Sequence, residues 1–309
     1  MRRVLALAVA GLAVVAAVAI SSNSLLPDLR ADGVVVPAGG PLPLPADPDP
    51  DDPEPENLNA PPMALAPPSG AVVQQALVRL LKPKVDYQAP RRVGIQIGHW
   101  QTTDIPKEYG ARLATQTGTS WAGITEVDVS MEVAERMATI LRAQGVEVDI
   151  LPTTVPVGYL ADVFIALHCD GDGVGAISGF KMSHGSRRGP FEDKLLNDVK
   201  QSYGKATGLD YDAEHVSRNM TGYFAFNWSR FQHSASPFTP AVILEMGFLS
   251  HPDDRDLLVN HPDVVAKAIT DGILRFLDST PRAKIFGDDL LVPTTPLRPG
   301  PFVPPSPSP

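Results

Sequence analysis

Four segments of the chain carry the apolar patterns expected of buried strands. Residues 163–167, Val-Phe-Ile-Ala-Leu, are apolar on both faces, which is typical of a central parallel strand. Residues 93–98 and 241–244 are similar short apolar runs. Between residues 146 and 150, Val and Ile alternate with Glu and Asp, and this period of two predicts a strand at or near a sheet edge.

Three longer segments have the spacing of amphipathic helices. From Thr125 to Gly145 the apolar positions recur at steps of four and three residues, and Gly145 fits the position just after the last turn. Residues 191–203 and 262–277 are also predicted helices, the second being the last of the chain. Strands that alternate with helices predict an α/β domain with a mostly parallel, twisted sheet and helices on both faces.

Composition divides the 309 residues into one domain with two extensions. We assign residues 89–280 to the folded domain, which is long enough to bury a core unaided. Residues 25–88 are rich in Pro and Asp, which predicts a disordered linker, although helix-like spacing at 71–82 favours a short helix there. Residues 281–309 are predicted to be a disordered, Pro-rich tail, with packing of residues 283–292 on the domain as an open alternative.

The first 24 residues carry the features of an export element. Arg2 and Arg3 precede an uncharged apolar run from Val4 to Ile20. This run fits both a signal peptide, with a cleavage site at Ala17-Val18-Ala19, and a short membrane anchor, so both interpretations stay open. Either one places the rest of the chain outside the cytoplasm, and contact with a membrane is expected only through this segment.

The charge distribution gives no indication of a nucleic-acid partner. The formal net charge is −9, and residues 47–56 contribute six acidic groups and no basic one, so the folded part is nearer to neutral. The sequence has no basic block of the kind that binds nucleic acid. Cys169 is the only cysteine, which excludes an intrachain disulfide. No feature identifies an activating protein.

Three of the predicted strands end on residues that bind metals or take protons, His99, His168 and Glu245. Because the carboxyl ends of parallel strands meet at one sheet edge, we expect these residues to lie together with Glu126, in the first turn of a helix. Two imidazoles and one carboxylate suit Zn²⁺, and a second carboxylate takes the proton of the water that the metal activates. We therefore predict a zinc site with His99, Glu126 and His168 as ligands and Glu245 as general base.

Each of these residues has a simpler interpretation when it is taken alone. A lone His or Glu at a strand end is more often a hydrogen-bonded structural residue, and no local spacing motif links the four. Their convergence on one edge favours the metal site. Trp100 and His233 are further candidates for contact with substrate, with core packing and a solvated loop position as the alternatives.

Two segments carry a specific family resemblance. Residues 161–168, Ala-Asp-Val-Phe-Ile-Ala-Leu-His, and residues 244–250, Leu-Glu-Met-Gly-Phe-Leu-Ser, resemble segments of the zinc-dependent N-acetylmuramoyl-L-alanine amidases of the Amidase_3 type, which are bacterial peptidoglycan hydrolases. The first segment ends on a zinc-binding His in that family, and the second holds the catalytic Glu. Ile97-Gly98-His99 and Thr125-Glu126 resemble the two remaining ligand motifs less specifically.

The resemblance runs from about residue 92 to residue 277 and implies hydrolysis of the amide between N-acetylmuramic acid and L-alanine of the stem peptide. Three departures concern the rim of the site. Trp100-Gln101 replaces glycines, residues 151–160 are shorter than the family's segment, and Cys169-Asp170 replaces Ala-Asn. They remove no ligand or base, so they bear on substrate preference.

Two other functions are compatible with the sequence. The first is a zinc amidohydrolase or peptidase that acts on another amide, because the departures lie where specificity is determined. The second is an inactive domain that binds the cell wall. The presence of Glu245 argues against a pure binding domain, which has no use for a catalytic carboxylate.

Overall fold

The computed structural model describes residues 77–185 and 189–293. The predicted export element at 1–24, linker residues 25–76 and tail residues 294–309 lie outside the described residues. Within the described part of the chain, no helix combines the length and apolar character needed to cross a membrane.

A five-stranded sheet forms the centre of the domain, with the strand order β5-β2-β6-β8-β7. The first four strands of this order are parallel to one another, and β7 is antiparallel to β8. As predicted, β6 lies at the middle of the sheet and β5 at an edge. The strands are β2 (Arg92–Ile97), β5 (Glu147–Leu151), β6 (Val163–Asp170), β7 (Lys181–Ser183) and β8 (Ala241–Phe248).

The remaining elements surround this sheet. Two small antiparallel sheets pair β1 (Leu77–Leu80) with β9 (Leu290–Pro293) and β3 (Ser120–Trp121) with β4 (Ile124–Thr125). The α-helices are α1 (Ala111–Ala114), α2 (Glu126–Ala143), α3 (Glu192–Thr207), α4 (Arg218–Thr221), α5 (Pro252–Asn260), α6 (Pro262–Ser279) and α7 (Arg282–Phe286). The 3₁₀ helices are η1 (Thr102–Asp104), η2 (Lys107–Tyr109) and η3 (Phe224–Phe226).

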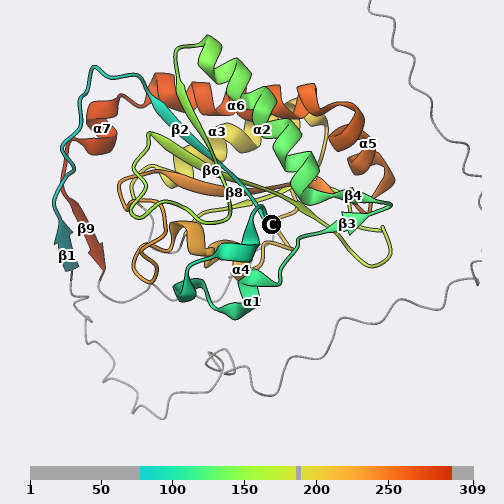
Figure 1. The fold of residues 1–309 in the computed structure, drawn as a ribbon. Coiled ribbons are helices and arrows are strands. Elements are labelled where there is room, and N and C mark those ends of the chain that lie inside the picture. Colours follow the sequence, from blue (N-terminus) through green and yellow to red (C-terminus); the bar gives the residue numbers. More distant parts are fainter. Residues whose placement is uncertain (1–76, 186–188, 294–309) are drawn as a thin grey trace, which may run out of the picture. The chain divides into compact units, whose positions relative to one another are not determined.

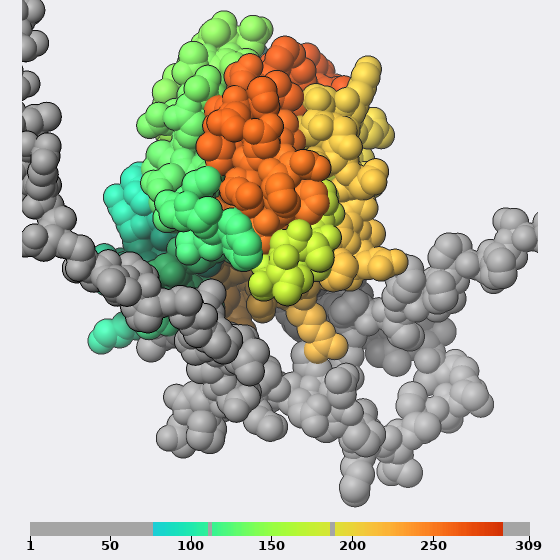
Figure 2. All heavy atoms as spheres, turned by 90° about the vertical axis from the view of Figure 1, so that its right-hand side faces the viewer, coloured from blue at the N-terminus to red at the C-terminus, as the bar shows by residue number. Residues whose placement is uncertain are grey.

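The long helices α2, α3 and α6 cover one face of the sheet (Figure 1). Alternate residues of the central strand, such as Val163, Ile165 and Leu167, face these helices and belong to the larger apolar core. Helix α6 packs against both α2 and α3. In Figure 2 the orange surface, which includes α5, accordingly lies between the green of α2 and the yellow of α3.

Loops and short helices cover the other face. Phe164, Ala166 and Ile243 point to this side and pack in a second, smaller cluster with residues of the segments 151–161 and 220–235. Helix α4 and the 3₁₀ helix η3 are the regular elements of the second segment. The predicted α/β class is confirmed, but the helices are distributed unevenly between the two faces. No sequence pattern predicted that one layer is made mostly of loops.

The folded domain extends beyond both predicted boundaries. Residues 77–80 form strand β1 rather than part of a helix over 71–82, and residues 71–76 lie outside the described residues. Helix α6 is followed by α7 and β9, so it is not the last helix, and residues 282–293 belong to the domain rather than to the tail. The error arose because β1 and β9 are too short to show a period and stabilise each other only by pairing.

Buried Asp162 is the main link between these flanking segments and the sheet. Its carboxylate is fully buried and forms ion pairs with Arg91 Nε at 2.7 Å and with Arg282 of α7 at 3.0 Å. It also accepts a hydrogen bond of 2.8 Å from the backbone N–H of Arg92. Arg282 in turn donates to the carbonyl oxygens of Asp86 and Ala89, so one carboxylate fixes both ends of the domain.

Helices α3 and α6 approach each other most closely at Gly272. An added Cβ at Gly272 would lie 2.5 Å from Val199 Cα and 2.9 Å from the carbonyl oxygen of Asp198, and backbone atoms cannot move aside as a side chain can. Gly272→Ala is therefore expected to reduce the free energy of unfolding by about 1–3 kcal/mol. Urea denaturation of the wild type and the variant measures this difference.

Gly204→Ala in α3 is the matched control for this prediction. Its added Cβ would lie 3.4 Å from the ring of Phe180 and 3.6 Å from the carbonyl oxygen of Leu209, and both distances are ordinary contacts. Alanine is favoured over glycine inside a helix by about 0.5–1 kcal/mol, so this variant is expected to be as stable as the wild type or slightly more stable. Equal stability of the two variants would contradict the proposed close approach at Gly272.

Candidate metal centre

The structure brings the three predicted metal ligands together. One donor atom from each of His99, Glu126 and His168 lies within 4.8 Å of the other two. His99 follows β2, Glu126 is the first residue of α2, and His168 lies in β6. The three residues are far apart in sequence, and they meet because β2 and β6 are parallel neighbours whose carboxyl ends share an edge.

Glu245 is on the adjacent strand. In the register of the parallel pair β6 and β8, Glu245 lies directly beside His168, so both side chains point to the same face of the sheet. The strands continue past these residues, to Asp170 and Phe248, whereas the sequence predicted that each strand ends there. A register irregularity of the kind seen at β-bulges lies between His168 and Asp170, and the pairing resumes at Asp170 and Phe248.

Glu126 is held in place by the start of its helix. The hydroxyl of Thr125 accepts a hydrogen bond of 3.1 Å from the backbone N–H of Asp128, which caps α2 and places Glu126 in the first turn. Glu126 Oε2 accepts a hydrogen bond of 2.7 Å from the backbone N–H of Thr119, and Oε1 lies 2.7 Å from His168 Nδ1. The Glu126 side chain is 2% exposed, so its orientation is fixed.

Two unusual backbone positions allow His99 and His168 to approach each other. His99 has a φ of 60°, which is uncommon for a residue with a side chain and typical of functional positions. Gly98 leaves room for the neighbouring imidazole, because an added Cβ would lie 2.2 Å from His168 Cε1. The two rings meet edge to face with centroids 5.1 Å apart, and His99 Nδ1 lies 3.1 Å from the carbonyl oxygen of Gln116.

Burial and mutual contact shift the pKa values of the three candidate metal ligands. Burial lowers the pKa of His99, which favours the neutral ring that metals bind. Burial alone would raise the pKa of Glu126, but the hydrogen bond from His168 and the attraction between the two side chains lower it overall. Burial likewise opposes the charge on His168, but the Glu126 carboxylate raises its pKa overall. A metal ion that binds His168 competes with a proton on the ring, so metal affinity is expected to depend on pH.

Glu245 has the properties of a group that exchanges protons near neutral pH. Burial raises the pKa of Glu245 to about 7, and the charges of His168 and Lys181 limit the rise. The other two carboxylates nearby, Glu126 and Asp170, act in the same direction as burial. Among the described atoms, Glu245 Oε2 is buried without a hydrogen-bond partner. A carboxyl group in this state is suited to general acid-base catalysis.

The cluster opens into a cavity of about 380 Å³. The lining is mainly polar and comprises His99, Gln116, Thr117, Gly118, Thr119, Glu126, His168, Cys169, Asp170 and Glu245. Two nitrogen donors and a carboxylate, open on one side to a cavity that also holds a free carboxylate, form the ligand set of a catalytic zinc site. The residues present therefore fit a metal ion of this kind.

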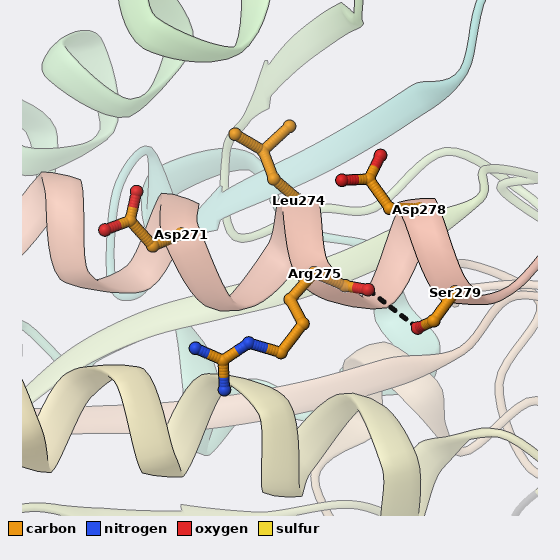
Figure 3. Close-up of a pocket in the computed structure, with 5 residues that line it drawn as sticks. All are labelled: Asp271, Leu274, Arg275, Asp278 and Ser279. Atoms are coloured by element: carbon orange, nitrogen blue, oxygen red, sulfur yellow. Dashed lines mark hydrogen bonds between the residues drawn. The ribbon is translucent and has the colours of Figure 1, made fainter.

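A larger cavity, beside α6, has no comparable chemistry. It measures about 590 Å³ and is lined only by residues of α6: Asp271, Leu274, Arg275, Asp278 and Ser279. In Figure 3 the Arg275 side chain points toward α3, away from Asp271 and Asp278. Arg275 donates a hydrogen bond of 3.1 Å to Ser202 Oγ of that helix, so these side chains diverge and do not enclose a ligand.

A comparison with protein-family profiles shows which family the chain belongs to. The profile of the Amidase_3 family, described as N-acetylmuramoyl-L-alanine amidase, matches residues 93–275, more than half of the chain. The chain belongs to the Amidase_3 family. The resemblance inferred from the four motifs is thereby confirmed, and the protein is an amidase of the peptidoglycan hydrolase class. No curated protein matches the chain at a significant level.

Several solved structures resemble this Amidase_3 domain. They include the amidase Ami1 from Mycobacterium smegmatis, with 18% identity and a TM-score of 0.46 over 62% of this chain and 98% of that chain. The catalytic domain of the amidase CwlV from Bacillus (Paenibacillus) polymyxa has 22% identity and a TM-score of 0.40 over 61% and 98% of the two chains. An amidase from Clostridium difficile 630 has 17% identity and a TM-score of 0.44 over 62% and 99%.

Neither of the two predicted substrate-binding residues of the Amidase_3 domain is among the residues that line the cavity. Trp100 packs against the larger core, and His233 forms an ion pair of 2.8 Å with Glu108 of η2. Contact of either side chain with substrate stays a prediction. Sequence reasoning did not place Tyr223 at the metal cluster, although its hydroxyl lies 2.9 Å from His168 Nε2. It also missed Gln96, a fully buried polar residue within an apolar strand. The polar residue Gln96 within an apolar strand was the signal in the sequence that could have indicated this network.

Proposed function

We propose that this Amidase_3 domain uses zinc to hydrolyse the amide between the lactyl group of N-acetylmuramic acid and L-alanine of the stem peptide. The observation that carries the proposal is the position of Glu245, which is the register neighbour of His168 and faces the same cavity as the three ligand residues. A metal site next to a carboxyl group that titrates near neutral pH is the arrangement that metal-assisted hydrolysis requires.

Each residue has a distinct task in the proposed reaction. His99, Glu126 and His168 hold the zinc, which supplies Lewis acidity and lowers the pKa of water. Glu245 accepts the proton from the attacking water and then donates it to the nitrogen of the departing L-alanine, so the amine leaves neutral. The polar loop 116–119 and Asp170 border the space in which the substrate amide lies.

We also propose that the domain works outside the cytoplasm, where peptidoglycan is found. The support is the apolar run from Val4 to Ile20 behind two arginines, which lies outside the described residues and fits a signal peptide or an anchor. Cell fractionation, with amino-terminal sequencing of the exported protein, distinguishes a cleaved signal from a retained anchor.

Zinc content tests the proposed cofactor. The purified protein is expected to hold one zinc per chain, and a chelator is expected to abolish hydrolysis of sacculi. His99→Ala and His168→Ala are expected to lose the metal, because each removes one of three protein ligands. His215→Ala is the control, since His215 is exposed and pairs with Asp212 on the surface. Full zinc occupancy in both ligand variants would contradict the site.

The products identify the bond that is cut. Mass spectrometry of fragments from digested sacculi is expected to find stem peptides with a free amino-terminal L-alanine and glycan strands without peptide. Release of fragments cut elsewhere in the peptide would favour a peptidase that uses the same zinc site. Binding to sacculi without any release would favour the inactive cell-wall-binding domain.

A further inference from the structure

His168 is held on its outer side by a chain of hydrogen bonds that leads away from the metal cluster. Its Nε2 lies 2.9 Å from the hydroxyl oxygen of Tyr223. That hydroxyl lies 2.9 Å from Gln96 Oε1, and Gln96 Nε2 lies 2.8 Å from the carbonyl oxygen of Thr153. The imidazole and phenol rings also meet edge to face, with centroids 5.4 Å apart and an angle of 89°.

The carbonyl group of Thr153, at the end of this series of hydrogen bonds, determines which atom donates in each of them. The carbonyl of Thr153 can only accept, so the amide nitrogen of Gln96 must face it and donate. Gln96 Oε1 then faces Tyr223 and can only accept, which uses the single proton of the Tyr223 hydroxyl. The Tyr223 oxygen is left as an acceptor, and it accepts a hydrogen bond from His168 Nε2–H.

We propose that Gln96 and Tyr223 are positioning residues that hold His168 in the tautomer with the proton on Nε2, so that Nδ1 is the nitrogen presented to the metal. Nδ1 is also the nitrogen on the side of the cluster, 2.7 Å from Glu126 Oε1. The inference rests on the proposed zinc chemistry and adds to it the device that selects the donor atom.

The two histidines of the cluster are oriented by different devices. His99 Nδ1 lies 3.1 Å from the carbonyl oxygen of Gln116, which accepts its proton and leaves Nε2 to face Glu126. The two rings therefore present opposite nitrogens to the same site. A hydrogen bond to the outer nitrogen of a ligating histidine fixes its ring and raises its basicity, and losing this partner typically costs about 10- to 100-fold in metal affinity.

The series of hydrogen bonds from His168 to Thr153 is anchored in buried parts of the fold. Gln96 is 0% exposed and lies in β2 between Ile95 and Ile97, which face the long helices. A polar side chain in such a position must satisfy its hydrogen bonds within the protein, and Gln96 does so at both ends of its amide. The backbone N–H of Thr153 is itself bonded to the carbonyl oxygen of Trp100, at 2.9 Å. The tautomer of His168 thus depends on buried backbone rather than on solvent.

Nitrogen-15 NMR of the zinc-loaded wild-type protein tests the tautomer directly. The expected spectrum of His168 has a protonated Nε2 and a metal-bound Nδ1, whereas His99 has the reverse pattern. A metal-bound Nε2 on His168 would overturn the inference without any variant. A wild-type protein that binds no zinc at all would overturn the proposed function together with the inference.

Tyr223→Phe tests the role of the hydroxyl. We expect its zinc affinity, measured by competition with a chelator, to fall about 10- to 100-fold, with His168 showing a mixture of tautomers. Tyr211→Phe is the control, because it removes a similar hydrogen bond, of 3.1 Å to the carbonyl oxygen of Met182, away from the metal cluster. Its zinc affinity is expected to equal that of the wild type.

Gln96→Met provides a second variant of nearly the same size. It frees the Tyr223 proton to point at His168 Nε2, so zinc affinity is expected to fall although the phenol is still present. If wild-type zinc binding persists in both Tyr223→Phe and Gln96→Met, the positioning role is refuted while the zinc site itself stands. Reduced affinity in both variants, with zinc retained in Tyr211→Phe, supports it.

Discussion

Glu245→Gln is expected to reduce kcat by about 10²- to 10⁴-fold while zinc remains bound. The amide keeps the shape of the carboxyl group and its capacity for hydrogen bonding, but it cannot accept the proton of the attacking water. Substrate affinity is expected to change little, because the loss falls on the chemical step. Steady-state kinetics on soluble muropeptides, together with zinc analysis of the same samples, measures both quantities.

Glu126→Gln is the matched comparison, because it makes the same chemical change at the other carboxylate of the site. Here the substitution replaces an anionic metal donor that lies within 4.8 Å of both imidazole donors. Zinc affinity itself is expected to fall, and added zinc is expected to restore part of the activity. If Glu245→Gln emptied the site and Glu126→Gln left it full but inactive, the roles of the two carboxylates would be exchanged.

Asp162→Ala is expected to have the largest effect on stability, a loss of about 3–5 kcal/mol in the free energy of unfolding. The substitution leaves the guanidinium groups of Arg91 and Arg282 largely buried without their counter-ion, at 22% and 13% exposure. It also leaves the backbone N–H of Arg92 without its acceptor. Denaturation in guanidinium chloride or urea measures the loss.

Glu132→Ala serves as the control for Asp162→Ala. Glu132 pairs with Arg136 one turn along α2, and both side chains are close to half exposed. Exposed pairs of this kind contribute about 0.3–0.5 kcal/mol. A loss at Asp162 no larger than the loss at Glu132 would show that the arginines find other partners and that the carboxylate does not hold the ends of the domain.

The metal centre was predictable because its residues follow regular structure. His168 and Glu245 each come after a run of apolar residues, and parallel strands place such positions side by side. The position of Glu126 could also be predicted, because a recognisable cap places it in the first turn of a helix. Local pattern and one rule of topology therefore predict which side chains meet at this edge of the sheet.

The parts that escaped prediction depend on contacts between distant, irregular segments. The loop that brings Tyr223 to His168 has no periodic pattern, and its conformation depends on the core that it covers. The strands β1 and β9 are four residues each and pair across more than 200 positions of sequence. A single sequence does not contain information on such pairings, because each partner alone has no preference for the structure it adopts.

The pairing of β1 with β9 also determines how the domain responds to mechanical load. Leu77 is opposite Pro293, so the chain enters and leaves the described domain at the same end of this small sheet. A force that pulls Leu77 and Pro293 apart would break the hydrogen bonds between β1 and β9 one after another, because it loads the pair from one end. The pair would thus open at a lower force than the five-stranded sheet that positions His168 and Glu245.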